Sequence, residues 1–314
     1  MTTCIQGAQI LVLYYRFILV SIAAIVAVVC SIVFVPDYAE AGKKTTSVKI
    51  GFAKTFLVDQ PKSIADVATE DFMDVLKKTT ALEGNLDSKL GAIEIADHLM
   101  SKKFDFGIFH GHEFAWAKKK HPELQPLLIA LNKQTAERAF VIVHVNNPAK
   151  TFADIRGKKI DIAQGTKEPC RVFLDMLCRG AQAKNTTAFF GAIERSNSII
   201  TALDAVAREK VQAAVIDSVN LAHYKDVRGP VFEKNLRVLA QSGIFPPAAV
   251  AYLPGKVDDA IVKQFRDGLL SAHKVAAGRE MMQHWRIDAF DLVPSDYAKG
   301  LESVLKDHPV SPAP

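Results

Sequence analysis

The residues with the clearest chemical potential lie in Gln164–Pro169, between an apolar run and an amphipathic segment. The run Lys159–Ala163 predicts a buried strand. Pro169 is typical of the first turn of a helix, where its missing N–H would be unpaired anyway. Free backbone N–H groups and the positive end of a helix dipole favour an anion at such a terminus, and Thr166 and Lys167 lie beside them. The pattern predicts an anion-binding loop. The alternative is an ordinary strand-to-helix connection, in which the same pattern of residues also occurs.

A second polar group, His110-Gly111-His112-Glu113, follows the apolar run Phe104–Phe109. Two histidines separated by one residue can lie on one side of an extended segment, so a metal site is one interpretation. No third ligand of matching spacing is found in the sequence, and a helix beginning at His112 would separate the two rings. We therefore expect no metal, and we interpret either histidine as a hydrogen-bond donor to a ligand.

Catalytic motifs are not found in the sequence: there is no GxSxG, Walker loop, GxGxxG or zinc-protease helix. Cys170 could imitate a thiol nucleophile, but its place in the first turn of a largely apolar helix indicates packing. Cys178 follows about 12 Å further along the helix axis, too far for a disulfide, so we expect both cysteines to be buried. We predict a binding protein without a cofactor rather than an enzyme.

The composition limits the class of protein. The chain has 314 residues, 49% of them hydrophobic, and a net charge of +5 that is dispersed along the sequence. Nucleic-acid binding would need a basic stripe, and the sequence has none, so we expect no nucleic-acid partner. The length allows two lobes with separate cores. The beginning of the chain has the order of a secretory signal peptide: a positive residue, Arg16, then an uncharged run over residues 17–35, then the small-residue motif Ala39-Glu40-Ala41, with cleavage after Ala41. The run could also span a bilayer, so residues 1–41 are either a signal peptide or a membrane anchor. Both place the remainder outside the cytoplasm.

Short apolar strands alternate with amphipathic helices along the rest of the chain, which predicts an α/β fold with mostly parallel, doubly wound sheets. A short second strand could lie within Leu82–Leu90. We expect strands at Val48–Phe52, Phe104–Phe109, Leu124–Leu131, Ala139–Val145, Lys159–Ala163, Ala213–Ile216, Leu236–Ala240 and Ala248–Tyr252. We expect helices at Ser63–Thr80, Gly91–Lys102, His112–Lys120, Pro169–Arg179, Asn197–Lys210, Ser218–Tyr224, Val257–Ala277 and Ser295–Lys306.

Two segments that contain proline, the polar His144–Pro148 and the later Gly243–Pro247, predict chain crossings between two lobes. We therefore expect a first lobe of residues 45–143 and 246–308, a second lobe of residues 144–245, and a two-stranded hinge between them.

This order of elements after an export leader resembles the type II periplasmic solute-binding proteins, and more closely the phosphate/phosphite/phosphonate-binding subfamily that serves ABC importers. The resemblance rests on FDFGIFHGHEFAWAKKKHPELQPL, TFADIRGKKIDIA and SNSIITALDAVAREKVQAAVIDS. It implies a periplasmic protein, expected to be a monomer, that binds a small oxyanion such as phosphonate, phosphite or phosphate between its lobes. An ABC permease would be its partner in the membrane. The alternatives are a binding module for another small organic anion and a membrane-tethered sensor domain.

The sequence departs from the family's pattern where ligand contacts are expected. The family's Ser-Thr-Ser-Gly loop corresponds to Gln164–Glu168, its His-Asp pair to Ser196-Asn197, and its tyrosine near the second crossover to Phe114. Fewer hydroxyl and imidazole donors remain, so another small polar or anionic solute is also compatible with the sequence.

Ligands of open α/β sheets bind at the carboxyl ends of the strands, and this rule selects the loops that hold our candidate residues. Ser196, Asn197 and Asp217 could also cap helices, and Lys167 could pair with Glu168 or face solvent. The resemblance implies that Asp217 could accept a hydrogen bond from a protonated oxyanion. Arg138 and Arg195 are alternative counter-charges. The candidate ligand-binding residues are Thr55, Phe56, Gly111, His112, Phe114, Gly165, Thr166, Lys167, Glu168, Ser196, Asn197, Asp217 and Ser218.

Overall fold

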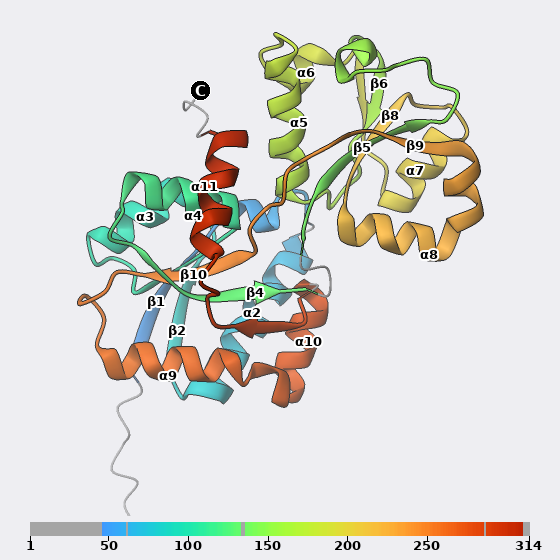
Figure 1. The fold of residues 1–314 in the computed structure, drawn as a ribbon. Helices are drawn as coiled ribbons and strands as arrows, with labels where there is room; N and C mark the ends of the chain where they lie inside the picture. The colour runs from blue at the N-terminus through green and yellow to red at the C-terminus, as the bar shows by residue number, and fades with distance from the viewer. Residues whose placement is uncertain (1–45, 61, 133–135, 286, 310–314) are drawn as a thin grey trace, which may run out of the picture. The chain divides into compact units, whose positions relative to one another are not determined.

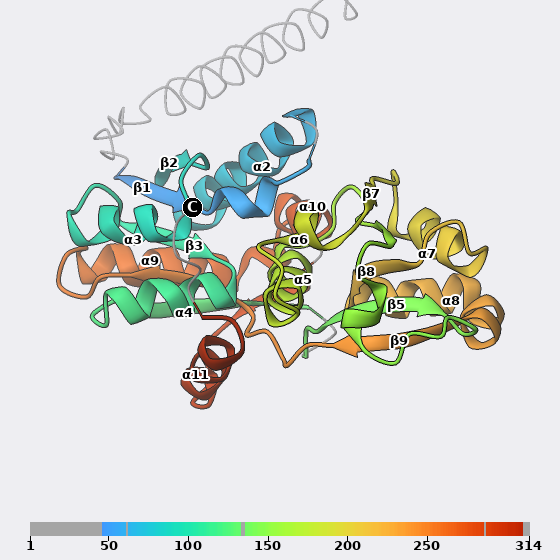
Figure 2. The ribbon, with the colours of Figure 1, turned by 90° about the horizontal axis from the view of Figure 1, so that it is seen from above.

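The computed structural model describes residues 46–60, 62–132, 136–285 and 287–309, which contain two β-sheets packed against helices (Figure 1, Figure 2). This confirms the predicted α/β class with two sheets. The predicted leader, residues 1–41, lies outside the described residues. Within the described ranges, no helix has the length and apolar character needed to cross a membrane.

The first sheet has six strands in the order β11-β4-β10-β3-β1-β2. These strands are β1 (Ser47–Phe52), β2 (Glu83–Asp87), β3 (Phe106–Phe109), β4 (Gln125–Leu131), β10 (Ala248–Tyr252) and β11 (Ala289–Asp291). One face packs against α2 (Lys62–Thr80), α9 (Asp259–Leu270) and α10 (Ala276–Trp285), and the other against α3 (Ala92–Met100), α4 (Gly111–Lys120) and α11 (Tyr297–Asp307) (Figure 1). Two short 3-10 helices, η1 (Lys54–Leu57) and η3 (Ala272–Lys274), complete this lobe.

The alternation of buried and exposed side chains determines how β1 lies in this sheet. Val48, Ile50 and Phe52 point to one face of the strand and are buried. They share a core cluster with Phe72 of α2 and Phe265 of α9. Complete burial of such a side chain stabilises the fold by about 1.5–3 kcal/mol. The packing therefore fixes the end of β1, from which η1 begins.

The second sheet has five strands in the order β7-β6-β8-β5-β9. They are β5 (Ala139–His144), β6 (Lys159–Asp161), β7 (Ala192–Glu194), β8 (Ala213–Asp217) and β9 (Leu236–Gln241). Helices α5 (Glu168–Gly180) and α6 (Thr186–Phe189) pack on one face, while α7 (Ile199–Ala207) and α8 (Ser218–Asn235) pack on the other (Figure 2). A 3-10 helix, η2 (Phe152–Ile155), follows β5.

The first crossing between the sheets differs from the prediction. Strand β5 pairs with β8 and β9, so it belongs to the second sheet, and the assignment of residues 139–143 to the first lobe is wrong. The chain crosses between Leu131 and Ala139 instead of at His144–Pro148. The apolar residues of β5 are the reason, because Val141 and Val143 are completely buried in the second sheet's ladder.

The second crossing lies between β9 and β10, in agreement with the predicted Gly243–Pro247 segment. The two crossings pair with each other, because Glu137 and Phe245 form an antiparallel bridge and the Phe245 N–H donates to the Glu137 carbonyl at 2.8 Å. These segments form the predicted two-stranded hinge.

Both sheets are mixed rather than mostly parallel. Strand β10 runs antiparallel to β3 and β4, and β5 runs antiparallel to β8 and β9. Each of these two strands enters its sheet directly from a crossing, so it begins at the edge where its neighbour ends. Ala139 at the start of β5 accordingly lies opposite Asp217 at the end of β8.

Candidate functional site

The first element of the site is the N-terminus of α5, which begins at Glu168 with Lys167 as its N-cap residue and Pro169 in its first turn. This confirms the predicted helix start to within one residue. The preceding loop turns at Gly165, whose φ of +72° is readily reached by glycine alone. A Cβ added there would lie 3.5 Å from the Gln60 side-chain nitrogen, so the loop faces the first lobe.

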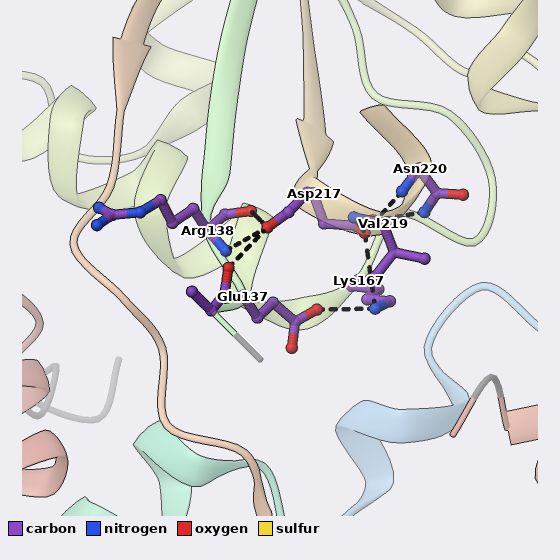
Figure 3. Close-up of polar contacts among 8 residues, drawn as sticks. Glu137, Arg138, Lys167, Asp217, Val219 and Asn220 are labelled. Atoms are coloured by element: carbon purple, nitrogen blue, oxygen red, sulfur yellow. Dashed lines mark hydrogen bonds and ion pairs between the residues drawn. The ribbon is translucent and has the colours of Figure 1, made fainter. Parts of the chain in front are cut away.

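Lys167 is held by two carboxylates of the second lobe and the hinge. Its Nζ lies 2.7 Å from Glu137 Oε1 and 3.6 Å from Asp217 Oδ1 (Figure 3). Burial acts to lower the pKa of Lys167, but Asp217 and Glu137 outweigh it and raise the pKa above its usual range. The lysine is thus a permanent cation whose charge is already balanced.

Asp217 and Ser218 have structural partners at the start of α8. The Asp217 carboxylate accepts from the N–H groups of Val219 and Asn220 at 3.0 and 3.1 Å, which confirms its predicted capping role (Figure 3). The Ser218 hydroxyl oxygen accepts from the Arg138 N–H at 2.7 Å, in the first crossing. Arg138 itself donates to the Ser242 carbonyl at 2.8 Å, in the second crossing. These side chains hold the hinge, and the predicted ligand contact of Ser218 and the counter-charge role of Arg138 stay predictions.

The donors of Thr166 are directed into its own loop. Its hydroxyl and its N–H both lie within hydrogen-bonding distance of the Ala163 carbonyl, at 2.7 and 3.2 Å, and the residue is buried. The first N–H groups of any helix have no partner inside the helix. At this terminus the N–H groups of Lys167 and Glu168 are therefore the donors best placed for an anion.

Glu113 of α4 is the buried acid of the first lobe. Its Oε1 accepts from the Thr55 hydroxyl at 2.8 Å and its Oε2 from the His110 N–H at 3.2 Å. Burial raises the pKa of Glu113 to about 7, although the bonds from Thr55 and His110 act to lower it. The Thr55 hydroxyl thus orients Glu113, and its predicted ligand contact stays a prediction.

Glu168, in the second lobe, is a second acid whose pKa is raised. Burial raises its pKa to about 7, and the nearby carboxyl of Glu113 raises it further, while Arg171 opposes the shift. Two acids with raised pKa values, one from each lobe, therefore lie close enough to interact.

The two histidines have different environments. His110 is the N-cap residue of α4, and its ring stacks on Phe56 with centroids 3.7 Å apart. Burial and the charge of Lys167 lower the pKa of His110 to about 3, so its ring is neutral beside the second lobe. His112 lies completely buried against Trp116 and Phe245, and burial also holds its pKa well below the usual range. Of the pair, His110 together with Phe56 belongs to the site.

No group of three or more His, Cys, Asp or Glu side chains within the described ranges is placed to hold a metal ion. Cys170 and Cys178 are free and buried, as expected, and burial raises the pKa of both thiols. Neither is an activated nucleophile.

Gly111 and Phe114 serve packing. A Cβ on Gly111 would lie 2.1 Å from the Pro246 carbonyl oxygen, so the second crossing passes directly over it. The Phe114 ring is completely buried next to Phe109 and Tyr297. The predicted ligand contacts of both residues stay predictions.

Ser196 and Asn197 do not cap a helix. The N-cap of α7 is Ser198, whose hydroxyl oxygen accepts from the Thr201 N–H at 3.1 Å. Ser196 instead uses its hydroxyl and N–H to bind the buried carboxylate of Asp161, at the end of β6. Asn197 is exposed. The capping prediction failed because three adjacent polar residues offer the same signal.

Asp59 joins the lobes and was missed by the sequence reasoning. Its carboxylate, between η1 and α2, forms ion pairs with Arg171 of α5 and Arg195 after β7. Arg195 is one of the counter-charges predicted from the sequence, whereas Asp59 lies in a polar stretch without any motif. We define the interlobe site as Phe56, Asp59, His110, Glu113, Gly165, Lys167, Glu168, Arg171 and Arg195.

The comparisons with known proteins agree with this fold. The sequence matches the profile of a family described as ABC transporter, phosphonate, periplasmic substrate-binding protein, over residues 55–297. No match was found among curated proteins.

Several solved structures are similar to the chain at low sequence identity. The XAC2383 protein of Xanthomonas citri, bound to chloride ion, has a TM-score of 0.58 and 15% identity, and the match covers 83% of this chain and 96% of that one. A binding protein component of an ABC phosphonate transporter from Pseudomonas aeruginosa has a TM-score of 0.56 and 11% identity, covering 84% and 87%. PhnD1 from Prochlorococcus marinus, in complex with methylphosphonate, has a TM-score of 0.54 and 14% identity, covering 83% and 97%. At these identities the likeness establishes the type II periplasmic-binding fold.

Proposed function

This chain belongs to the periplasmic substrate-binding proteins of phosphonate ABC transporters, and from that premise we propose that it binds a small oxyanion, a phosphonate, phosphite or phosphate, at the N-terminus of α5. Binding rather than catalysis is the role of the family. The ligand would lie between the two lobes and be delivered to an ABC permease.

The observation that carries the proposal is the orientation of the α5 terminus toward the first lobe. Gly165 faces Gln60 there, and Lys167 lies close enough to His110 to lower its pKa. The positive end of the helix dipole and free N–H groups would meet the oxyanion. The stacked rings of Phe56 and His110 would wall the opposite side.

The site differs from a purely cationic pocket. Lys167 is balanced by Glu137 and Asp217, whereas Arg171 and Arg195 share the single carboxylate of Asp59. Backbone N–H groups would provide hydrogen bonds and the charge left on the two arginines would add attraction, which suits a tetrahedral oxyanion that accepts several hydrogen bonds.

A thermal-shift panel of methylphosphonate, phosphite, phosphate, an alkylsulfonate and sulfate tests the ligand class. A ligand that binds the native state alone raises Tm with its concentration. We expect phosphorus oxyanions to raise Tm and the sulfur compounds to act weakly. A shift with the sulfonate alone would replace the proposal with the organic-anion alternative.

Lys167→Gln locates the binding site. Because Lys167 balances the carboxylates of Glu137 and Asp217 beside the α5 terminus, the variant leaves both uncompensated where the oxyanion would bind, and we expect it to lose the ligand-dependent shift. Lys158→Gln is the matched control, since Lys158 is exposed in the same lobe. An unchanged shift in Lys167→Gln would place the ligand elsewhere.

A further inference from the structure

Helix α11 lies along the second crossing. At the start of the helix, the Tyr297 hydroxyl donates to the Pro247 carbonyl at 2.9 Å. At its end, a Cβ added to Gly243 would lie 2.6 Å from the Asp307 carboxylate. Because Pro247 precedes β10 of the first sheet and Gly243 follows β9 of the second, the helix runs from the first lobe toward the second beside the crossing.

The residue that follows α11 is a buried histidine whose backbone is held by the first lobe. His308 is only 2% exposed. Its carbonyl accepts from the Trp116 side-chain N–H, on α4, at 2.9 Å. Its own N–H donates to the Val304 carbonyl at 2.7 Å. These bonds fix His308 to α4 and α11.

The ring of His308 contacts the second crossing and the second lobe. It stacks on the Phe245 ring, with centroids 4.8 Å apart and an interplanar angle of 21°. It also meets the Phe173 ring of α5 edge-on, with centroids 6.4 Å apart. Stacked and edge-on ring pairs at such distances attract each other beyond the effect of the area that they bury. His308 therefore connects α4 and α11 of the first lobe to α5 of the second.

Packing rather than hydrogen bonding accounts for the position of this ring. The Nδ1 atom of His308 is buried and has no hydrogen-bond partner among the described residues. Leu301 and Val304 of α11 belong to the same core cluster as Phe173 and Phe245. Separation of the lobes at this point would expose these apolar surfaces to water, which is unfavourable.

We propose that the end of α11, Asp307 and His308, is a strap, a noncovalent link beside the two crossings that holds α5 against the first lobe. Opening of the lobes would pull Phe173 away from His308, because Trp116 holds His308 to the first lobe. The strap acts on the lobes themselves, whatever ligand lies between them. The ion pairs of Asp59 also link the lobes, but they act through charge, whereas the strap acts through packing.

Three variants separate the ring from its surroundings. His308→Ala removes the ring and leaves the backbone bonds of this residue in place. His308→Phe keeps a ring that can stack on Phe245, and the Nδ1 atom that it loses has no partner there. Lys306→Ala, at an exposed position of α11, is the matched control.

Small-angle X-ray scattering of the ligand-free protein measures the separation of the lobes as a radius of gyration. The measurement is made at about 0.1 M and about 1 M NaCl, since the higher salt shortens the Debye length from about 10 to about 3 Å and weakens the Asp59 ion pairs. We expect a larger radius of gyration in His308→Ala than in the wild type, with the larger difference at the higher salt. His308→Phe and Lys306→Ala should keep the wild-type value. Hydrogen exchange of the amides in β1 and β8 reports whether each lobe remains folded.

Equal radii of gyration for the wild type and His308→Ala at both salt concentrations would overturn the strap. Loss of amide protection in β1 or β8 of His308→Ala would overturn it as well, because the ring would then support the fold of one lobe rather than the link between the two. Equal expansion of His308→Phe and His308→Ala would contradict the role of ring packing and overturn the strap in this form.

Discussion

The carboxylate of Asp59 in the first lobe pairs with the guanidinium of Arg171 in the second. Arg195 reaches the same carboxylate oxygen. These contacts link the loop after β1 to the helix whose N-terminus we assign to the ligand. The ion pairs therefore stabilise the arrangement in which the two halves of the interlobe site face each other.

Asp59→Asn should weaken oxyanion binding by up to about fivefold, because partly exposed ion pairs contribute up to about 1 kcal/mol. The dissociation constant of methylphosphonate measures this effect. Asp66→Asn, on the exposed face of α2, is the matched control. Identical dissociation constants in all three proteins would show that the Asp59 contacts do not support binding.

Gly111→Ala should lower the free energy of unfolding by about 1–3 kcal/mol, the usual cost of adding atoms to a packed region. The added Cβ would meet the Pro246 carbonyl oxygen at 2.1 Å, and backbone cannot yield as a flexible side chain does. Urea unfolding measures the change. Gly180→Ala, at the end of α5, has open space around its added Cβ and should be neutral or slightly stabilising. Equal stabilities for the two variants would contradict the packing assigned to Gly111.

The pH dependence of stability should reveal the protonated state of Glu113. Its pKa is raised to about 7 in the folded protein, against about 4.3 in an unfolded chain. Between these values the folded state holds a proton that the unfolded state has released. The contribution of Glu113 to the free energy of unfolding is thus fully present below about pH 4 and is lost as the pH rises through about 7.

The difference in unfolding free energy between the wild type and Glu113→Gln reports this contribution together with the part of the Glu168 shift that Glu113 causes, and it should fall as the pH rises from about 4.5 to about 8. His110 acts with the opposite sign, because burial and Lys167 lower its pKa to about 3 and its contribution is lost as the pH falls below about 6.5. This background is common to both proteins. A difference that is constant across the range would mean that Glu113 is ionised in the folded state.

The fold was predictable where hydrophobic pattern and local signals agree. Strand Ala248–Tyr252 and the start of α5 at Pro169 were located to within one residue, because apolar residues and a helix-start proline act locally. The sequence did not predict the three-residue strands β7 and β11 or the one-turn helix α6, because three or four residues are too few to show a hydrophobic period. The predicted helix Val257–Ala277 is divided into α9, η3 and part of α10.

The assignment of β5 shows what local pattern leaves open. Its apolar sequence predicts a strand correctly, but either sheet could bury it, and the choice depends on long-range pairing with β8. The site shows the same division. The position of the α5 terminus followed from Pro169, whereas Glu137 and Asp59 became partners of Lys167 and Arg171 only through tertiary folding.

A crystal structure of the protein grown with methylphosphonate tests the central claim most directly. The account predicts that the phosphonate oxygens accept hydrogen bonds from the backbone N–H groups of Lys167 and Glu168, with Phe56 and His110 on the opposite side. A ligand bound away from the first turn of α5, or contacts made to side chains of the first lobe alone, would contradict it.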